Sequence, residues 1–325
     1  MKRSTIAGYW GIGLVLLVFP LVIKNPYWVD VLNNVGLYAI LGLSLNLILG
    51  HAGLFHMGHA AFYAVGAYTT AIISTTWHIP VLWLFPLSGL TAGIFALIVA
   101  RPIIHLRGDY LLIVTIGMVE IVRIALINDI FGITGGSNGI FGISRPMIFG
   151  YKIAKPHQFY YLIGSFLVVS IFLFRRLEAS RFGRALNYIK ADDVAAEGCG
   201  VNTAYYKLAA FVIGAVWAGM AGNIFAAKMT IIAPESFNFW ESVILFTMVI
   251  LGGSGSIPGV LLGAVIVIGL PELFREFASA RMLVFGAAMV AMMIFRNKGI
   301  LPPVPRTYRY DRHRTTAANQ PGGGA

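Results

Sequence analysis

Long apolar runs alternate with short polar stretches along most of the chain. A run of about 20 residues with little or no charge is what an α-helix needs to cross the hydrocarbon core of a membrane. We expect a membrane-spanning helix in each run that reaches or approaches this length. These runs are residues 6–23, 31–50, 60–77, 79–100, 110–127, 158–174 and 208–227.

The C-terminal third is apolar but less regular. Residues 242–271 carry no charge, and the sequence Gly-Gly-Ser-Gly-Ser-Ile-Pro-Gly at 252–259 interrupts them. Because glycine and proline break regular structure, this stretch predicts two short spans joined by a tight turn, or a re-entrant element. Residues 282–295 predict a short last span. The fold class predicted is therefore all-α, a polytopic transmembrane helical bundle of about ten spans with broken or re-entrant segments.

Composition favours a membrane-embedded body over a soluble one. Hydrophobic residues occupy 58% of the 325 positions and charged residues 11%, whereas soluble domains carry about 25% charged residues. We therefore take residues 1–303 as one transmembrane domain and residues 304–325 as a basic, disordered cytoplasmic tail. The single cysteine, Cys199, excludes an intramolecular disulfide and a multi-cysteine metal site.

The net charge of +11 is explained by membrane topology rather than by nucleic-acid binding. Lys and Arg gather in the loops between apolar runs and in the tail, and no basic soluble face studded with aromatic residues is found. Placing both termini in the cytoplasm puts most of the 24 Lys and Arg residues on the inner side, as the positive-inside rule requires. The loop 175–207 is then cytoplasmic and the loop 134–157 is outside.

The sequence contains no nucleotide-binding loop. Neither Gly-Lys-Ser nor Gly-Lys-Thr occurs, and the glycine-rich stretch at 252–259 lacks the lysine that reaches phosphates. We find no paired catalytic groups within a span. The prediction is a transport subunit rather than an enzyme, with no catalytic residue, no metal and no cofactor of its own.

The most unusual segment follows the run 31–50. Residues 51–59 contain three histidines, and glycines interrupt what would otherwise be one long helix. Metal binding by His56 and His59 is one interpretation, and a plain interfacial loop is another. We also consider an unwound segment lining a water-filled path, because broken helices at membrane depth persist only where they are buried or face a cavity. The candidate path residues are Ser44, Asn46, Gly50, Gly53, Gly58 and His59.

Glu120 and Arg123 lie within the predicted span 110–127. Residues three positions apart share a helix face, so these two side chains can pair. A substrate or proton path is one interpretation of charges at this depth. We favour a neutralising pair that locks two helices together.

The loop 175–207 contains a candidate docking helix. Residues 184–197 predict a short helix with Leu186, Ile189 and Val194 on its apolar side. Such a helix suits docking into a groove on a soluble partner, and its acidic residues argue against the alternative of lying in anionic headgroups. The residues predicted to serve coupling to that partner are Arg184, Leu186, Ile189, Asp192, Asp193, Ala196, Glu197 and Gly200.

Several segments, taken in order, carry a family resemblance. The chain resembles the inner-membrane permease subunits of branched-chain amino acid ABC importers, of the LivM type. The resemblance covers nearly the whole chain and is strongest from about residue 183 onward. It rests on Gly-His-Ala-Ala-Phe at 58–62, Val-Ile-Leu-Gly-Gly-Ser-Gly-Ser at 249–256 and Lys-Gly-Ile-Leu-Pro at 298–302, together with residues 42–47, 66–68, 107–110, 134–139, 192–196, 200–202 and 234–237.

The resemblance implies a complex in the bacterial cytoplasmic (inner) membrane. Its other members would be a LivH-type permease, two cytoplasmic ATPase subunits that bind ATP and Mg²⁺, and a periplasmic substrate-binding protein. The loop around residues 192–200 resembles the coupling helix that docks into an ATPase. His51 and His56 depart from the usual pattern, which leaves the role of their segment open. Related permeases carry urea, short amides or sugars, and a proton-coupled secondary transporter is a further alternative.

Overall fold

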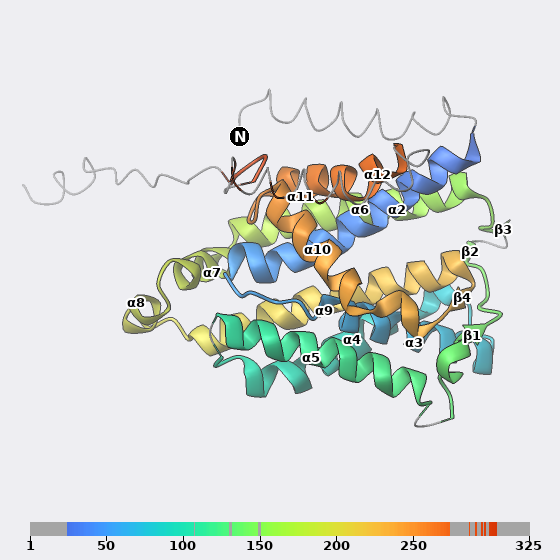
Figure 1. The fold of residues 1–325 in the computed structure, drawn as a ribbon, viewed down its shortest axis with the longest axis horizontal. Helices are drawn as coiled ribbons and strands as arrows, with labels where there is room; N and C mark the ends of the chain where they lie inside the picture. The colour runs from blue at the N-terminus through green and yellow to red at the C-terminus, as the bar shows by residue number, and fades with distance from the viewer. Residues whose placement is uncertain are drawn as a thin grey trace, which may run out of the picture.

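The computed structural model describes residues 25–106, 108–129, 132–148, 151–273, 286, 290, 294, 296 and 299–303. Within them the chain is a bundle of helices that lie roughly along one common direction (Figure 1). The helices are α2 (Pro26–Asn46), α3 (His59–Trp77), α4 (Phe85–Ile103), α5 (Asp109–Ile127), α6 (Pro156–Ala179), α7 (Arg181–Ala191), α8 (Asp193–Gly198), α9 (Thr203–Met229), α10 (Phe239–Gly252), α11 (Ile257–Ala264) and α12 (Leu270–Leu273).

Shorter elements connect these helices. Two π-helical turns, η1 (Leu47–His51) and η5 (Val265–Gly269), continue α2 and α11. The 3-10 turns are η2 (Val81–Leu84), η3 (Gly136–Asn138) and η4 (Pro234–Phe237). Two antiparallel pairs of two-residue strands close one end of the bundle: β1 (Ile140–Phe141) with β4 (Ile231–Ile232), and β2 (Met147–Ile148) with β3 (Tyr151–Lys152).

Local sequence sets where several helices begin. Asn25 caps α2 by accepting a hydrogen bond from the Tyr27 N–H, and Pro26 supplies a first residue with a fixed φ. Asn202 caps α9 and Asn238 caps α10 in the same way. These side chains satisfy backbone donors that the first turn of a helix leaves without a partner.

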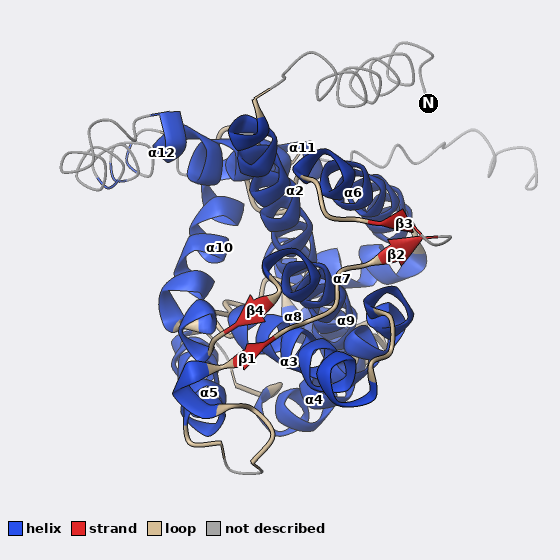
Figure 2. Ribbon diagram, turned by 90° about the vertical axis from the view of Figure 1, so that its right-hand side faces the viewer, coloured by secondary structure: helices blue, strands red, loops and turns tan. Residues whose placement is uncertain are grey.

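The centre of the bundle is α2 with η1. In its most apolar window 78% of the residues are buried, against 22% in α5. Helices α6, α9, α10 and α11 pack around α2, whereas α5 lies at the edge beside α3 and α10 (Figure 2). Apolar side chains of the outer helix α5, such as Ile113 and Ile121, are exposed, as expected of a helix that spans a membrane.

Small residues let α3, α4 and α9 approach one another closely, because they recur at four-residue spacing in α4 (Gly89, Gly93) and in α9 (Gly214, Ala218, Gly222). A Cβ atom on Gly66 would lie 2.3 Å from the Cα of Gly219, and one on Gly222 would lie 2.5 Å from the Tyr63 carbonyl oxygen. A Cβ on Gly93 would lie 2.7 Å from the Val216 side chain. These spacings thus serve packing within the chain.

The all-α prediction is confirmed, and several predicted spans are found as helices. Within the described part of the chain, 5 helices are long and apolar enough to cross a membrane. The shorter α10 (14 residues) and α11 meet at the glycine-rich break, as expected for a tight turn between short spans. The predicted span 6–23 and the tail 304–325 lie outside the described residues, and 282–295 is described only at isolated positions. The total of about ten spans therefore stays a prediction. The helices that are long and apolar enough to cross a membrane are Pro26–His51, Val81–Ile103, Asp109–Ile127, Pro156–Ala179 and Thr203–Met229.

The two ends of the bundle differ in character. Helices α7 and α8 project from one end, and the strands lie at the other (Figure 1). The predicted loops 175–207 and 134–157 are therefore on opposite ends of the bundle, as alternating spans require.

Candidate functional site

The chain unwinds between α2 and α3, inside the bundle. After the π-helical turn η1, residues 52–58 are non-helical, and α3 begins at His59. The freed backbone groups find partners: Leu54 N–H donates to the Ile48 carbonyl at 3.2 Å and Met57 N–H to the Thr115 hydroxyl at 3.1 Å. This is the predicted broken segment, and it survives at this depth because other helices cover it.

Side chains tie the start of α3 to the neighbouring helices. The Ser44 hydroxyl lies 2.7 Å from Nε2 of His59 and donates to the Leu41 carbonyl. The Ala60 N–H donates to the Ser242 hydroxyl of α10 at 3.1 Å. Ser44 and His59 are both fully buried. In this structure Ser44 therefore holds the break together; the prediction that it lines a path stays a prediction.

Asn46 joins the end of α2 to the glycine-rich turn between α10 and α11. Its Oδ1 accepts a hydrogen bond of 2.7 Å from the Gly255 N–H. Gly50 is needed beside it, because a Cβ there would lie 2.2 Å from that oxygen and 2.4 Å from the Gly255 nitrogen. Two segments more than 200 residues apart in the sequence are thus joined by this hydrogen bond and by the close approach of Gly50 to Gly255.

The turn itself requires glycine and supports a third segment. Gly253 has φ +122° and Gly255 φ +89°, conformations that other residues rarely adopt. Residues 300–301 dock onto it, with the Ile300 N–H donating to Leu251 and the Leu301 N–H donating to Gly252, both at 3.0 Å. A Cβ on Gly253 would lie 2.5 Å from the Leu301 carbonyl oxygen. Ser256 then caps α11.

Lys190 of α7 reaches the same place from the projecting end. Its Nζ donates a hydrogen bond of 2.7 Å to the Gly50 carbonyl oxygen. Its stem packs on Gly53, where a Cβ would lie 3.3 Å from the Lys190 Cβ and where φ is +71°. Burial lowers the pKa of Lys190. We call the cluster formed by Asn46, Gly50, Gly53, Lys190 and Gly255 the glycine junction.

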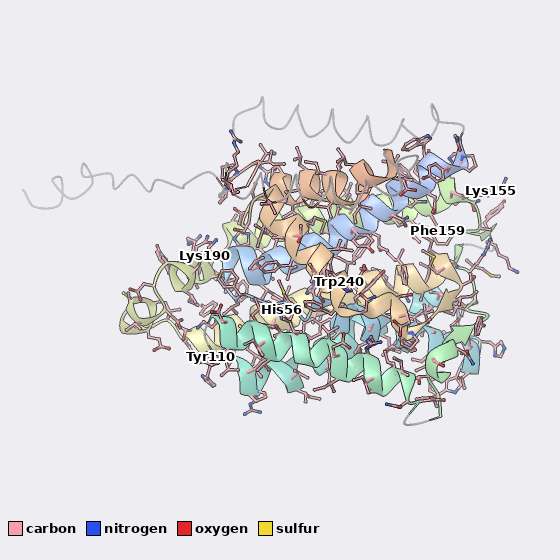
Figure 3. All side chains as sticks on the ribbon, viewed as in Figure 1. His56, Tyr110, Lys155, Phe159, Lys190 and Trp240 are labelled. Carbon is pink, nitrogen blue, oxygen red and sulfur yellow. The ribbon has the colours of Figure 1, made fainter. Side chains whose placement is uncertain are left out.

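Figure 3 shows Lys190 at the end of the bundle from which α7 projects, with His56 deeper among the helices. His51 Nδ1 also lies 3.5 Å from Oδ1 of Asn187, one turn from Lys190 on α7. The projecting loop therefore touches the broken helix at two neighbouring points. Sequence reasoning singled out Asn46, Gly50 and Gly53 but missed Lys190, because nothing in the sequence pairs it with a segment 140 residues away.

The loop 175–207 forms two helices rather than the single predicted helix over 184–197. The break falls at Asp192, whose Oδ1 accepts from the N–H groups of Val194 and Ala195 and so starts α8. The three predicted apolar side chains therefore do not share one face. Leu186 and Ile189 are buried within this chain rather than offered to a partner, whereas Val194 is 64% exposed.

The remaining predicted coupling residues serve the loop's own structure. Asp193 makes a 2.6 Å ion pair with Lys207 of α9, and Glu197 accepts a hydrogen bond from the Thr203 hydroxyl. Arg184 donates to the Ala179 carbonyl, Ala196 is buried, and Gly200 turns the chain with φ +81°. The side chains of α7 and α8 that stay exposed include two apolar ones, Tyr188 (57% exposed) and Val194, together with polar ones such as Asn187 and Asp192.

The predicted pair of Glu120 and Arg123 is present, at 2.9 Å. Arg123 also binds Glu235 of η4 at 3.0 Å, a partner that the sequence does not reveal. The arginine thus links α5 to the segment before α10. This contact supports the interpretation of a pair that joins two elements.

Sequence reasoning missed further charged groups within the bundle. Lys228, in the last turn of α9, makes a 2.8 Å ion pair with Asp30 of α2. Glu241 lies in the first turn of α10 and is only partly exposed. The signal was present for Glu241, because it directly precedes the charge-free run 242–271, but a boundary drawn at Ser242 left it out.

His56 is buried among aromatic rings rather than placed in a ligand set. Its ring lies 4.8 Å from that of Phe211 and 5.5 Å from that of Phe62, between centroids. Gly58 lies against it, since a Cβ there would be 2.7 Å from His56 Cε1. Among the described residues no group of three or more His, Cys, Asp or Glu could hold a metal ion.

Comparisons with known proteins agree on one family. The model of the branched-chain amino acid transport system permease component matches residues 27–294. The chain is 39% identical over 297 residues to the high-affinity branched-chain amino acid transport system permease protein LivM of Escherichia coli K12, covering 84% of this chain and 70% of that protein. The LivM protein of Salmonella typhimurium is equally similar.

A second permease type is also similar, at a lower level. The LivH protein of Escherichia coli K12 is 27% identical over 256 residues, covering 72% of this chain and 80% of that protein. No solved structure is significantly similar to the chain.

Proposed function

The chain belongs to the permease-component family of branched-chain amino acid transport systems, and we propose that it forms half of the membrane pore of an ABC importer for these amino acids. The main support for this proposal is the 39% identity to LivM proteins over 84% of the chain. The multi-pass helical bundle is the architecture that such a subunit needs. The proposed location is the bacterial cytoplasmic membrane, with both termini and the loop 175–207 inside.

The proposed second half of the pore is a LivH-type permease. The similarity of this chain to both LivM and LivH proteins supports a pair of related subunits. A shared ancestry allows two such chains to pack as a pseudosymmetric dimer. A periplasmic binding protein would then deliver the substrate to the pair.

ATP hydrolysis is assigned to two cytoplasmic partner subunits. This chain has no Gly-Lys-Ser or Gly-Lys-Thr sequence to cradle phosphates. The docking surface proposed for an ATPase is the projecting pair α7 and α8, whose exposed apolar residues Tyr188 and Val194 suit a groove. A Val194→Asp variant should weaken co-purification of the ATPases, and Val194→Thr, of similar shape, is its control.

The translocation path is proposed to pass the break between α2 and α3. Gly50, Gly53 and Gly58 interrupt the helix there, and carbonyl oxygens of the segment that already accept one hydrogen bond, as Gly50 does from Lys190, can accept a second from a passing ligand. An amino acid that has to leave the path on the other side should bind to it only weakly. We therefore assign recognition of the substrate to the periplasmic binding protein. The similarity to LivM and LivH proteins does not favour the alternatives of a urea or amide permease or of a proton-coupled transporter.

The experiment is co-purification from membranes in mild detergent, followed by mass spectrometry. We expect a tagged form of this chain to bring down one LivH-type permease and two copies of ATPase subunits. Isolation of the chain alone or as a homodimer, in membranes that contain the other subunits, would contradict the proposed complex.

A further inference from the structure

Three segments of the bundle meet at the Gly50 peptide. Its carbonyl accepts from Lys190, and its Cα lies so close to Gly255 that a Cβ would be 2.4 Å from the Gly255 nitrogen. Asn46, one turn earlier, bonds to that same nitrogen at 2.7 Å. A displacement of Lys190 therefore acts on the end of α2 and on the α10–α11 turn together.

The helix that carries Lys190 is held as a rigid element. Ser180 caps α7 at its start, and Leu186 and Ile189 are buried against the bundle. The stem of Lys190 lies against Gly53 with no room for a side chain between them. Because packed elements shift as units rather than deform continuously, a movement of α7 carries the lysine with it.

We propose that Lys190 is a positioning residue that transmits movement of α7 and α8 to the glycine junction, and through it to the broken helix α2–α3 and the turn α10–α11. This inference rests on the proposed function, since it takes α7 and α8 as the surface that an ATPase moves. The bond suits the task, because a hydrogen bond from a charged donor is stronger than one between neutral groups. Without the lysine, the carbonyl of the buried Gly50 loses this donor.

The test compares three variants in the complete transporter, reconstituted with its ATPases and binding protein. Lys190→Met keeps the apolar stem but removes the donor, Lys190→Arg keeps a charged donor, and Lys152→Met removes an exposed lysine of strand β3 as a control. The measurements are subunit co-purification, ATP hydrolysis and leucine uptake. We expect Lys190→Met to assemble and hydrolyse ATP while uptake per ATP falls about tenfold. Lys190→Arg should recover part of this loss, and Lys152→Met should match the unmodified protein.

A fourth variant tests the contacts beyond Lys190. Asn46→Ala removes the bond to Gly255 while leaving Lys190 in place. If both residues act through one junction, the double variant should lose little more uptake per ATP than the worse single variant, since effects within one network are not additive.

Several outcomes would overturn the inference. Unchanged uptake per ATP in Lys190→Met would show that the contact does not transmit movement. Loss of the assembled complex in both Lys190 variants would make the lysine a folding requirement instead. Failure of the proposed function looks different, because the unmodified chain would then show no ATPase co-purification and no ATP-dependent uptake.

Discussion

At the scale of single residues, side chains that suggest chemistry in the sequence prove to hold the structure together. Asn46 and Ser44 bond within the bundle, and Asp193 pairs with Lys207. Their polarity is evident from the sequence, but polar side chains inside a membrane bundle need partners, and one sequence does not reveal which. The glycines are easier to interpret, because glycines that interrupt a spanning run predict a break in the helix directly.

Asp193 and Lys207 provide a test of whether the acidic loop residues serve folding or docking. The side chains are mostly buried, with 20% and 9% exposed. Asp193→Lys alone should cost roughly 3 kcal/mol of stability, because it leaves two cations together. The exchange Asp193→Lys with Lys207→Asp should recover much of that loss, as measured by thermal unfolding in detergent. If the exchanged variant is as stable as the unmodified protein but does not bind the ATPase, Asp193 serves docking to the partner rather than folding.

Asn46 is predicted to affect both stability and transport. Asn46→Leu removes the acceptor for the buried Gly255 N–H, which should cost about 1–3 kcal/mol, and it should slow uptake while partner binding is retained. Asn128→Leu is a matched control, because Asn128 is exposed at the end of α5. Tight binding of leucine to the purified permease, lost in Asn46→Leu, would contradict the proposal that the path binds its substrate only weakly. It would show that this chain itself selects the substrate.

At the scale of elements, the apolar runs predicted the helices well, and the connections less well. Runs of about 20 residues leave few alternatives in a membrane, so α2, α4, α5, α6 and α9 follow the prediction. The division of the loop helix at Asp192 was missed although its signal was present, because aspartate is favoured at helix N-caps and disfavoured in helix interiors. The strand pairs were missed because two-residue strands have no periodic pattern.

The close packing of α3 and α9 gives a prediction with a built-in control. Gly66→Ala should prevent normal packing, because its Cβ would lie 2.3 Å from the backbone of Gly219, which cannot rotate away. Gly164→Ala in α6 adds the same methyl group where nothing lies within 4 Å, and it should be neutral or slightly stabilising. Yield and thermal stability in detergent measure both, and equal behaviour of the two variants would contradict the observed packing.

At the scale of the whole molecule, the distribution of Lys and Arg predicts which end of the bundle faces the cytoplasm, which the arrangement of the helices alone does not reveal. The loops 134–157 and 175–207 lie at opposite ends (Figure 1), and the excess of Lys and Arg assigns the latter to the cytoplasm. The substrate could not be derived from the residues in this way, because no fixed binding group identified it. It came from family resemblance, which the comparisons with LivM proteins support.

Orientation can be measured with one introduced cysteine. In a Cys199→Ser background, Ser137→Cys should react with a membrane-impermeant reagent in intact cells, because residue 137 belongs to the loop predicted outside. A cysteine at Tyr188, which is exposed on α7, should react only after the membrane is opened. The reverse pattern would invert the topology.

The central claim is that ATP hydrolysed by partner subunits drives amino acid passage through this chain. The most direct measurement is leucine uptake into proteoliposomes that contain the complete complex, with the binding protein outside and ATP inside. We predict uptake that requires hydrolysable ATP, resists a proton uncoupler and disappears when this chain is omitted. Uptake that continues without ATP and collapses with the uncoupler would contradict the claim.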